Sequence, residues 1–527
     1  MSSKPLSKSK SWRDALTVFA DRRAVIMLFL GFSAGIPILL IFSSLSLWLG
    51  EAGVERSAVT YFSWAALGYS FKFVWAPLID EIPVPILSRL LGRRRGWLLV
   101  AQLLVMVAIA MMAMTDPSLG PASLTSMAIA AVLLGFSAAT QDIVIDAYRI
   151  ELAEPEMQSA LAATYNMGYR LAMILAGAGA LFLASALGSE KGHYVYDAWK
   201  NTYLMMAGAM IVGLVTTLVI REPVRTTAAR PWTGSDYGRL VLVFLLAVSG
   251  FVYSFIKVGA SLPESDDALT GFGFEVIRML SAIAAAGIIG TLLVKLGVVN
   301  RQMAIQTWIA PVMDFFRRYG WKSALLLLAL IGLYRISDIV AGVISNVFYQ
   351  DMGFSKNEIA TAVKTFGVVV SIAGGFLGGL MAQRFAVMRV LMLGAVLSSL
   401  TNLIFIQVAL AGHDLFWMYV AVTADNLASG LAGAAFVAFL SSLTSVSFTA
   451  VQYAIFSSLM TLIPKVTGGY SGTIVDNVGY PMFFTITTLI GIPVLGLIVL
   501  AQRQLNMAYT PPDAPDDSAI SLKKDDL

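Results

Sequence analysis

The chain has 527 residues, of which 58% are hydrophobic and only 13% are charged, and its mean hydropathy is +0.78. A soluble protein carries about 25% charged residues, so the composition excludes a soluble globular class. The formal net charge of +4 indicates no nucleic-acid partner, and the lack of cysteine excludes disulfides, thiolate catalysis and Cys-ligated metals.

Apolar runs long enough to cross a bilayer recur along the whole chain. They predict an all-α polytopic membrane protein whose partner is the lipid bilayer. In chain order we predict fourteen helices, at 24–49, 58–79, 97–114, 122–148, 158–187, 202–220, 239–257, 274–297, 323–349, 359–381, 388–410, 415–440, 451–474 and 480–502.

Basic residues gather in the segments on one side of these helices. Examples are Arg22 and Arg23 before the first helix, Arg93 to Arg95 after the second, and Arg221 after the sixth. Because Lys and Arg are enriched in cytoplasmic loops, we expect both termini in the cytoplasm. Residues 299–321 interleave basic and apolar side chains and predict an amphipathic helix on that face, interrupted at Pro311.

The helices fall into two blocks of six with an added pair between them. The predicted organisation is a cytoplasmic segment at 1–23, a six-helix half at 24–220, a linker at 221–322 carrying the extra pair and the amphipathic helix, a second half at 323–502 and a cytoplasmic tail at 503–527. Two six-helix halves are the plan of the major facilitator superfamily, which binds substrate near the midplane between them.

An acidic residue and a basic cluster follow the second predicted helix. They are Asp80 and the run Arg93, Arg94, Arg95, and a weaker counterpart stands at the equivalent place in the second half. One interpretation is a solvated loop that obeys the inside-positive rule. The other is a conformational latch that breaks and reforms during rocking.

Several strings resemble the anhydromuropeptide permeases (AmpG-type), and the resemblance covers nearly the whole chain. They are GFSAGIP at 31–37, FKFVWAPLID at 71–80, GRRRGWLL at 92–99, ATQDIVIDAYR at 139–149, GYR at 168–170, PVMDFF at 311–316, YRISD at 334–338 and SFTAVQYA at 447–454.

The resemblance implies a proton-driven importer of N-acetylglucosaminyl-1,6-anhydro-N-acetylmuramyl units, with or without peptide. It also implies a part in peptidoglycan recycling and in β-lactamase induction, and it implies no cofactor. Two departures keep the charge: Asp425-Asn426 stands where shorter members have Glu-Asn, and Lys465 stands where they have Arg. Lys lacks the bidentate fork of Arg, which weakens a carboxylate-binding role at that position.

Asp142 and Asp146 lie one turn apart on one face of the fourth helix. Two nearby carboxylates in a poorly hydrated site resist ionising together, so one of them can hold a proton. We predict that Asp142 or Asp146 is the proton site, with Asp146 the more structural of the two. The alternative is that both form structural ion pairs with Lys72, Arg149 or Arg170.

Ionisable side chains inside membrane spans normally face a cavity or a partner. Lys72 and Arg170 suit the carboxylates of a muropeptide or, alternatively, neutralise the aspartates, and amides suit sugar hydroxyl and N-acetyl groups. Each polar group could instead join helices. The candidate substrate residues are Trp64, Lys72, Gln141, Tyr165, Arg170, Asp338, Lys364, Asp425, Asn426, Gln452 and Lys465.

Two other transport functions remain open, namely an exporter or drug pump of the same superfamily and an acetyl-CoA transporter. The chain shows no metal cluster, nucleophile elbow or phosphate-binding loop, so we expect no enzyme and no metal site. We expect the protein to act as a monomer.

Overall fold

The computed structural model describes residues 16–54, 62, 67–190, 192–224, 232–263, 268–468 and 470–508. In these ranges the regular structure is helical apart from one isolated β-bridge between Glu190 and His193. A bilayer offers no hydrogen-bond partners to the backbone, so spanning segments satisfy their own amide groups as helices. Thirteen described helices are long and apolar enough to span a membrane. The remaining prediction, 58–79, lies partly outside the described residues.

Five of the thirteen described spans lie in the N-terminal half, and several are broken into consecutive helices. Asp21 caps the first of these by accepting a hydrogen bond from the Arg23 amide at 2.8 Å. The elements are α2 (Arg22–Ile41), α3 (Ser43–Glu51), α5 (Leu67–Phe71), η3 (Lys72–Val74), α6 (Ala76–Glu81), α7 (Leu87–Leu90), α8 (Arg93–Ala113), α9 (Pro121–Leu152), α10 (Gln158–Ile174), η6 (Leu175–Gly179), α11 (Ala180–Ala186), α12 (Tyr196–Ala209) and α13 (Ile211–Val219).

The extra pair, the connector and the C-terminal half follow in that order. The elements are α14 (Gly234–Ser261), α15 (Ala268–Lys295), α16 (Arg301–Ala304), η7 (Ile305–Ile309), α17 (Ala310–Leu333), α18 (Ile336–Val343), α19 (Ser345–Asp351), α20 (Lys356–Ile359), η8 (Ala360–Phe366), α21 (Gly367–Arg384), α22 (Val387–Ala411), α23 (Leu415–Leu443), α24 (Thr449–Gly468) and α25 (Ser471–Ala508).

Glycine sets two of the sharp helix breaks. Gly320 (φ 73°) divides α17 and Gly479 (φ 75°) divides α25, and a residue without Cβ adopts such positive φ values readily. The expected interruption at Pro311 takes a different form. Proline lacks an amide donor and its ring crowds the carbonyl four residues earlier, and the preceding turn, 305–309, is π-helical. The connector bends sharply at Gly320 instead.

Glycines also allow two helix pairs to pack with their backbones in contact. A Cβ at Gly168 would lie 1.9 Å from the Leu28 carbonyl oxygen, and one at Gly31 would lie 2.1 Å from the Tyr165 carbonyl oxygen. This places α10 directly against α2. In the C-terminal half, Gly374 and Gly430 join α21 to α23 in the same way. Small residues permit such contacts between membrane helices.

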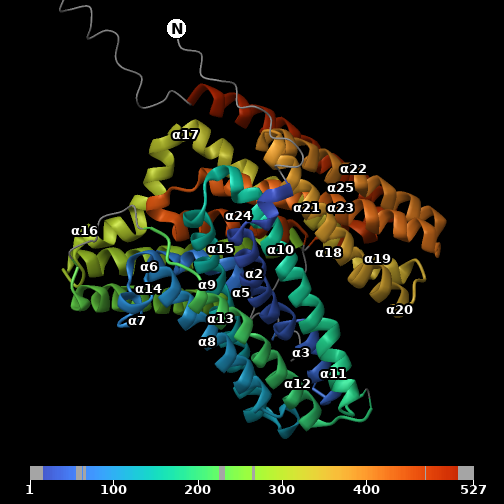
Figure 1. The fold of residues 1–527 in the computed structure, drawn as a ribbon, viewed down its shortest axis with the longest axis horizontal. Coiled ribbons are helices and arrows are strands. Elements are labelled where there is room, and N and C mark those ends of the chain that lie inside the picture. Colours follow the sequence, from blue (N-terminus) through green and yellow to red (C-terminus); the bar gives the residue numbers. More distant parts are fainter. Residues whose placement is uncertain are drawn as a thin grey trace, which may run out of the picture.

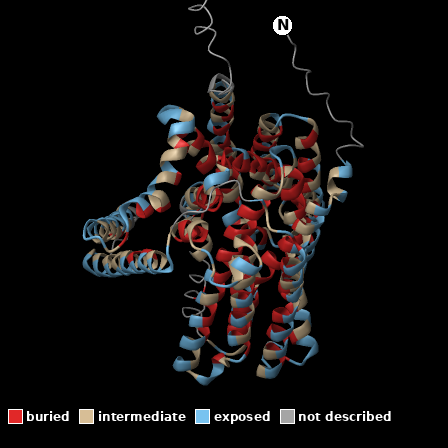
Figure 2. Ribbon diagram, turned by 60° about the vertical axis from the view of Figure 1, so that its left-hand side comes forward, coloured by how far each residue is buried: buried red, intermediate tan, exposed pale blue. Residues whose placement is uncertain are grey.

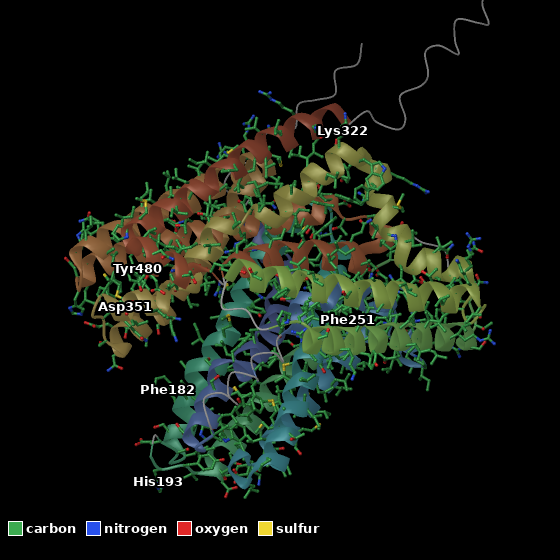
Figure 3. The ribbon with its side chains drawn as sticks, turned by 180° about the vertical axis from the view of Figure 1, so that it is seen from behind. Phe182, His193, Phe251, Lys322, Asp351 and Tyr480 are labelled. Atoms are coloured by element: carbon green, nitrogen blue, oxygen red, sulfur yellow. The ribbon has the colours of Figure 1, made fainter. Side chains whose placement is uncertain are left out.

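The two halves touch at one end and diverge at the other. In Figure 1, α3, α11 and α12 extend in one direction while α19 and α20 extend in another. Figure 3 shows His193 at the tip of one arm and Asp351 and Tyr480 at the tip of the other. We call the end where the halves meet the closed face, and the other end the diverging face.

The helices α14 and α15 form a hairpin that projects sideways from the bundle (Figure 2). Only 6% of the most apolar window of each is buried within the protein. Trp232 and Leu240 lie in a cluster with Leu78 and Met303 that attaches the base of the hairpin to α6 and α16. The hairpin therefore packs chiefly on itself, which leaves its apolar surface to lipid.

Candidate functional site

A buried arginine organises the closed face. The Arg94 guanidinium lies 2.7 Å from Asp80 Oδ1 and 2.5 Å from Glu151 Oε1, and its side chain is 1% exposed. Asp80 lies in the last turn of α6, Arg94 in the first turn of α8 and Glu151 in the last turn of α9. Because a buried charge needs partners, this triad binds the ends of three spans of the N-terminal half together.

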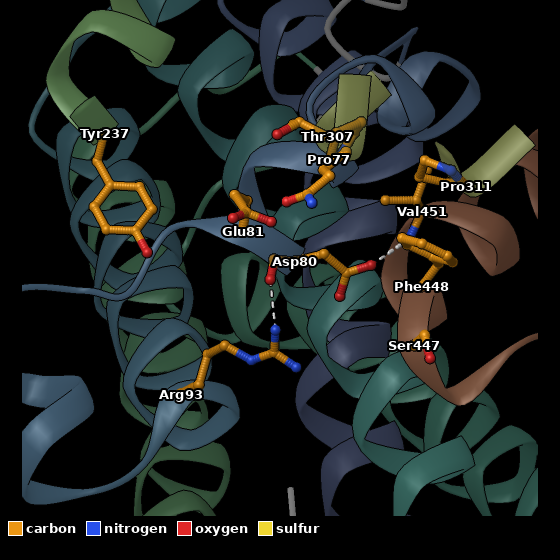
Figure 4. Close-up of a pocket in the computed structure, with 11 residues that line it drawn as sticks. Pro77, Asp80, Glu81, Arg93, Tyr237, Thr307, Pro311, Ser447, Phe448 and Val451 are labelled. Atoms are coloured by element: carbon orange, nitrogen blue, oxygen red, sulfur yellow. Dashed lines mark hydrogen bonds between the residues drawn. The ribbon is translucent and has the colours of Figure 1, made fainter. Parts of the chain in front are cut away.

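The carboxylates of Asp80 and Glu151 also contact the C-terminal half. Glu151 Oε1 accepts a hydrogen bond from Thr449 Oγ1 at 2.7 Å. Asp80 Oδ2 accepts one from the Val451 amide at 3.0 Å, which Figure 4 shows. Thr449 and Val451 lie in the first turn of α24. Carboxylates at a helix N-terminus also meet its positive dipole end. This geometry joins the halves at the position where the sequence predicted a latch.

Arg93 and Arg95 differ from Arg94 in their contacts. Arg93 NH1 donates to the Asp80 carbonyl at 2.5 Å and its NH2 lies 3.7 Å from Glu151. Arg95 instead donates to the Thr217 carbonyl at 3.0 Å and to the Leu218 carbonyl at 2.7 Å. Arg95 therefore caps the C-terminus of α13 within its own half. Of the predicted latch residues, Asp80 contacts the other half directly, and Arg94 pairs with the two carboxylates that make the contact.

Asp146 forms ion pairs with two cations. Lys72 Nζ lies 3.6 Å from Asp146 Oδ2, and Arg149 NH2 lies 3.4 Å from Asp146 Oδ1. Arg149 also reaches the other half, where it donates to Ser441 Oγ at 2.8 Å and stands 5.1 Å from the centre of the Tyr453 ring. Lys72 and Arg149 both pair with Asp146. The geometry of Asp146 and Lys72 therefore fits the alternative in which they form structural ion pairs.

Asp142 lies one turn away in a different setting. Its Oδ1 accepts a hydrogen bond from Tyr165 OH at 3.2 Å, and among the described residues no cation lies within ion-pair distance of it. The side chain of the neighbouring Gln141 is wholly buried inside the N-terminal half. Its Oε1 accepts a hydrogen bond from Ser33 Oγ at 3.3 Å. Gln141 therefore packs between helices, whereas Asp142 remains partly exposed.

Arg170 is the central cation between the halves. It is partly exposed on α10 and lies within electrostatic reach of Arg335 and Asp338 of the C-terminal half. Within the described ranges no carboxylate lies within ion-pair distance of Arg170. Arg335, in contrast, pairs with Asp338 (Nε to Oδ2, 3.1 Å) and donates to Ser429 Oγ at 2.9 Å. Arg335 thus holds Asp338 in an ion pair, while Arg170 lies near that pair without joining it.

The remaining candidates of the C-terminal half spread over several helices. Asp425 lies on α23 within electrostatic reach of Asp338 and Arg335, and Asn426 donates to the Val422 carbonyl of its own helix at 2.9 Å. Lys364 is exposed on the π-helical turn η8. Lys465 Nζ lies 3.4 Å from Ser70 Oγ of the other half. Asp338 is thus the member that lies near Arg170, and Asp425 lies near Asp338 and Arg335.

Gln452 and Trp64 stand apart from the other candidates. Gln452 Nε2 donates to the Pro311 carbonyl and to Asp314, both at 2.8 Å, while its Oε1 accepts from Arg318 at 2.9 Å. Its side chain is buried and fastens the connector to α24, so we leave it out of the substrate site proposed below. Trp64 lies outside the described residues.

Sequence reasoning missed three residues of this arrangement. Glu151 completes the Arg94 triad, Thr449 joins it to the other half, and Arg335 pairs with Asp338. The i, i+3 spacing of Arg335 and Asp338 was a visible signal. Glu151 and Thr449 carried no comparable signal, because their partners lie far away in the sequence.

A sequence model of the Major Facilitator Superfamily matches residues 24–348. The chain therefore belongs to this superfamily and is a multi-pass membrane transporter rather than an enzyme. The xylose–proton symporter XylE, bound to 6-bromo-6-deoxy-D-glucose, superposes with a TM-score of 0.58 at 13% identity, covering 92% of this chain and 95% of that one. FucP in its outward conformation gives 0.53 at 13% identity, covering 90% and 98%.

Within the superfamily, the chain is similar to named permeases over nearly its whole length. It is 29% identical to the anhydromuropeptide permease of Escherichia coli K12 over 496 residues, which are 94% of this chain and 82% of that protein. It is 27% identical to the putative transporter AmpG 4 of Rickettsia conorii over 490 residues, 93% and 99% of the two chains. These relatives agree with the resemblance found in the sequence.

Proposed function

We propose that the protein imports GlcNAc-1,6-anhydroMurNAc and its peptides across the bacterial inner membrane, driven by protons. Both termini lie in the cytoplasm, and the imported products serve peptidoglycan recycling and β-lactamase induction. The observation that carries the proposal is Arg170, a central cation with no carboxylate of the described residues in ion-pair distance, beside the Arg335–Asp338 pair. The similarity to an anhydromuropeptide permease supports the same substrate class.

The charge at the centre favours an anionic substrate. Fixed cations in poorly hydrated surroundings attract carboxylates strongly, and muropeptides carry carboxylates on the lactyl group or stem peptide. Arg170 comes from one half and Arg335 from the other. A substrate carboxylate bound to Arg170 therefore lies close to both halves, as alternating access requires.

The difference between the two aspartates supports a proton role for Asp142. Asp146 is held as a charged group by Lys72 and Arg149, so protonating it would break two ion pairs. Among the described residues, the hydrogen-bond partner of the Asp142 carboxylate is the Tyr165 hydroxyl. Lys72 acts on Asp142 only from beyond ion-pair distance. A carboxyl that forms no ion pair exchanges a proton at lower cost, and Tyr165 can remain as its partner in both states.

The closed and diverging faces support an outward-facing state. Cross-half contacts at Asp80, Glu151 and Arg149 hold the predicted cytoplasmic face shut, while the opposite ends of the halves diverge (Figure 1). A substrate then enters from the outside. The halves rock until the contacts of Asp80 and Glu151 with α24 separate and the closed face opens.

The test is uptake of radiolabelled GlcNAc-anhydroMurNAc into proteoliposomes with an inward pH gradient. The wild type is expected to accumulate the sugar, and Asp142→Asn is expected to abolish accumulation but retain exchange of labelled for unlabelled substrate. Exchange needs no net proton release, so it separates the proton role from substrate binding. Asp197→Asn, which removes a carboxylate that is 77% exposed, serves as the matched control.

Two results would contradict parts of the proposal. Full gradient-driven accumulation by Asp142→Asn removes the proton role from this residue. No uptake by a folded wild type, under either polarity of the gradient, removes the substrate class, and labelled acetyl-CoA and cationic drugs become the next substrates.

A further inference from the structure

An apolar groove of about 500 Å³ runs between α2 and α13 on the outside of the N-terminal half. Val25 and Phe29 line it from α2, and Val215 and Val219 line it from α13. These four side chains are 42%, 45%, 53% and 63% exposed, respectively. Each pair is spaced i, i+4, so the pairs form two parallel ridges with the groove between them.

The position of the groove identifies the source of its occupant. Both helices belong to membrane-spanning segments, and the lining extends from Arg22 to Phe29, a rise of about 10 Å at 1.5 Å per residue. A groove at this depth opens to the hydrocarbon of one leaflet rather than to water. An extended acyl chain is the apolar molecule that the leaflet supplies.

A cation stands at the end of the groove where the lipid head groups lie. Arg22 is exposed and is the first residue of α2. The acids beside it are engaged, because Asp21 pairs with Arg23 at 3.0 Å and Glu222 accepts the backbone amide of Arg94 at 2.8 Å and of Arg95 at 3.0 Å. Among the described residues, no carboxylate lies within ion-pair distance of Arg22.

We propose that this groove binds a phospholipid with an anionic head group, whose phosphate contacts Arg22 and whose acyl chain lies between α2 and α13. The site belongs wholly to the N-terminal half, so it keeps its shape while the halves rock. It is separate from the substrate and proton residues, and it does not depend on the identity of the transported molecule.

The head group supplies the selectivity of such a site. An acyl chain gains little by leaving bulk lipid for a groove of the same polarity, so the groove positions the lipid while Arg22 selects the charge. One cation near an anionic surface contributes about 1 kcal/mol, which corresponds to roughly a fivefold preference. Phosphatidylglycerol is therefore expected to bind about fivefold more tightly than phosphatidylcholine.

Native mass spectrometry of the full-length protein, titrated with each of these two lipids, tests the proposal. Arg22→Gln is expected to reduce the ratio of the affinities for phosphatidylglycerol and phosphatidylcholine to nearly one. The variant is still expected to bind a lipid through its acyl chain. Val215→Trp, which fills the groove, is expected to remove one bound lipid of either kind. Arg389→Gln changes an exposed arginine in the first turn of α22, away from the groove, and is the matched control.

The outcomes separate clearly. Loss of the preference in Arg22→Gln with its retention in Arg389→Gln supports the site. Equal loss in both variants, no preference in the wild type, or a second protomer bound in place of lipid would overturn it. Because Arg22 and Val215 are exposed, their variants are expected to keep the wild-type melting temperature, which is measured in parallel.

Discussion

Glu151 at the end of α9 accepts a hydrogen bond from Thr449, the first residue of α24, at 2.7 Å. The two residues belong to opposite halves of the transporter. The same carboxylate oxygen pairs with the buried Arg94 at 2.5 Å. The Glu151 carboxylate thus takes part both in the ion pairs of the N-terminal half and in the contact between the halves. Opening the closed face therefore disturbs the ion pair with Arg94 as well as the hydrogen bond from Thr449.

Removing the charge of Glu151 is expected to favour opening of the closed face. In Glu151→Gln, Arg94 keeps Asp80 as its carboxylate partner and the dipole of α24 loses a countercharge. A change of about 1.4 kcal/mol raises the open population tenfold. The chain contains no cysteine, so a thiol introduced as S159C is the single labelling site. Ser159 is buried between the halves near the Gly379 carbonyl. The rate of maleimide labelling of S159C therefore reports opening of the closed face.

The control for this measurement is Glu154→Gln, which alters an exposed carboxylate on the neighbouring turn. Its labelling rate is expected to match that of the S159C background. An unchanged rate in Glu151→Gln, or the same increase in both variants, would show that Glu151 does not hold the closed face.

Asp146→Asn is expected to lower the melting temperature, whereas Asp142→Asn is expected to leave it nearly unchanged. The first substitution deprives Lys72 and Arg149 of their shared carboxylate, and breaking a buried pair from one side costs about 3 kcal/mol. Adding Lys72→Leu to Asp146→Asn should recover part of the loss. Thermal unfolding of the purified proteins in detergent measures both effects, and equal melting temperatures for the two single variants would refute the assignment.

Arg170→Gln is expected to raise the KM for substrate by roughly tenfold or more, because a hydrogen bond to a charged group contributes about 1.5–3 kcal/mol. Arg170→Lys keeps the charge without the planar fork and should show a smaller increase. Stability should not fall, since Arg170 has no ion pair among the described residues. Initial uptake rates across a substrate series measure KM. Arg301→Gln, at an exposed position, is the control, and an unchanged KM in Arg170→Gln would exclude substrate contact.

Gln452→Leu is expected to destabilise the protein without changing substrate affinity. The variant removes the Gln452 donor from the carbonyl of the buried Pro311 and one partner each from Asp314 and Arg318. Leaving a buried polar group unsatisfied costs about 1–3 kcal/mol. Gln350→Leu, at an exposed glutamine of α19, is the matched control. Melting temperature and equilibrium substrate binding are measured together. A large loss of affinity with an unchanged melting temperature would return Gln452 to the substrate site.

Gly168→Val is expected to prevent normal packing of α10 on α2, since even a Cβ at this position would lie 1.9 Å from the Leu28 carbonyl oxygen. Overpacking typically costs about 1–3 kcal/mol, and a clash with backbone belongs at the upper end. Gly208→Val makes the same change in α12, where no atom lies within 4 Å of a Cβ. The yield of monodisperse protein after extraction compares them, and similar yields would contradict the packing argument.

The membrane class and the helical fold follow from the sequence alone. Apolar runs of spanning length permit one kind of structure in a bilayer, and Gly479 divides the last helices close to the boundary that hydropathy indicates. The resemblance strings predicted the relatives because an unusual run such as ATQDIVIDAYR at 139–149 can be read from the sequence without knowledge of the fold. Asp142 and Asp146 were recognisable because a charge in a membrane span is rare.

Only the tertiary structure decided what each of these groups touches. Asp142 and Asp146 look equivalent in sequence, yet the fold gives Asp146 two cations and gives Asp142 a tyrosine. Gln452 looked like a ligand for sugars and instead fastens the connector. Hydropathy reports the surroundings of a segment, whereas an ion pair depends on which side chains from distant segments meet. That information arises when the helices pack.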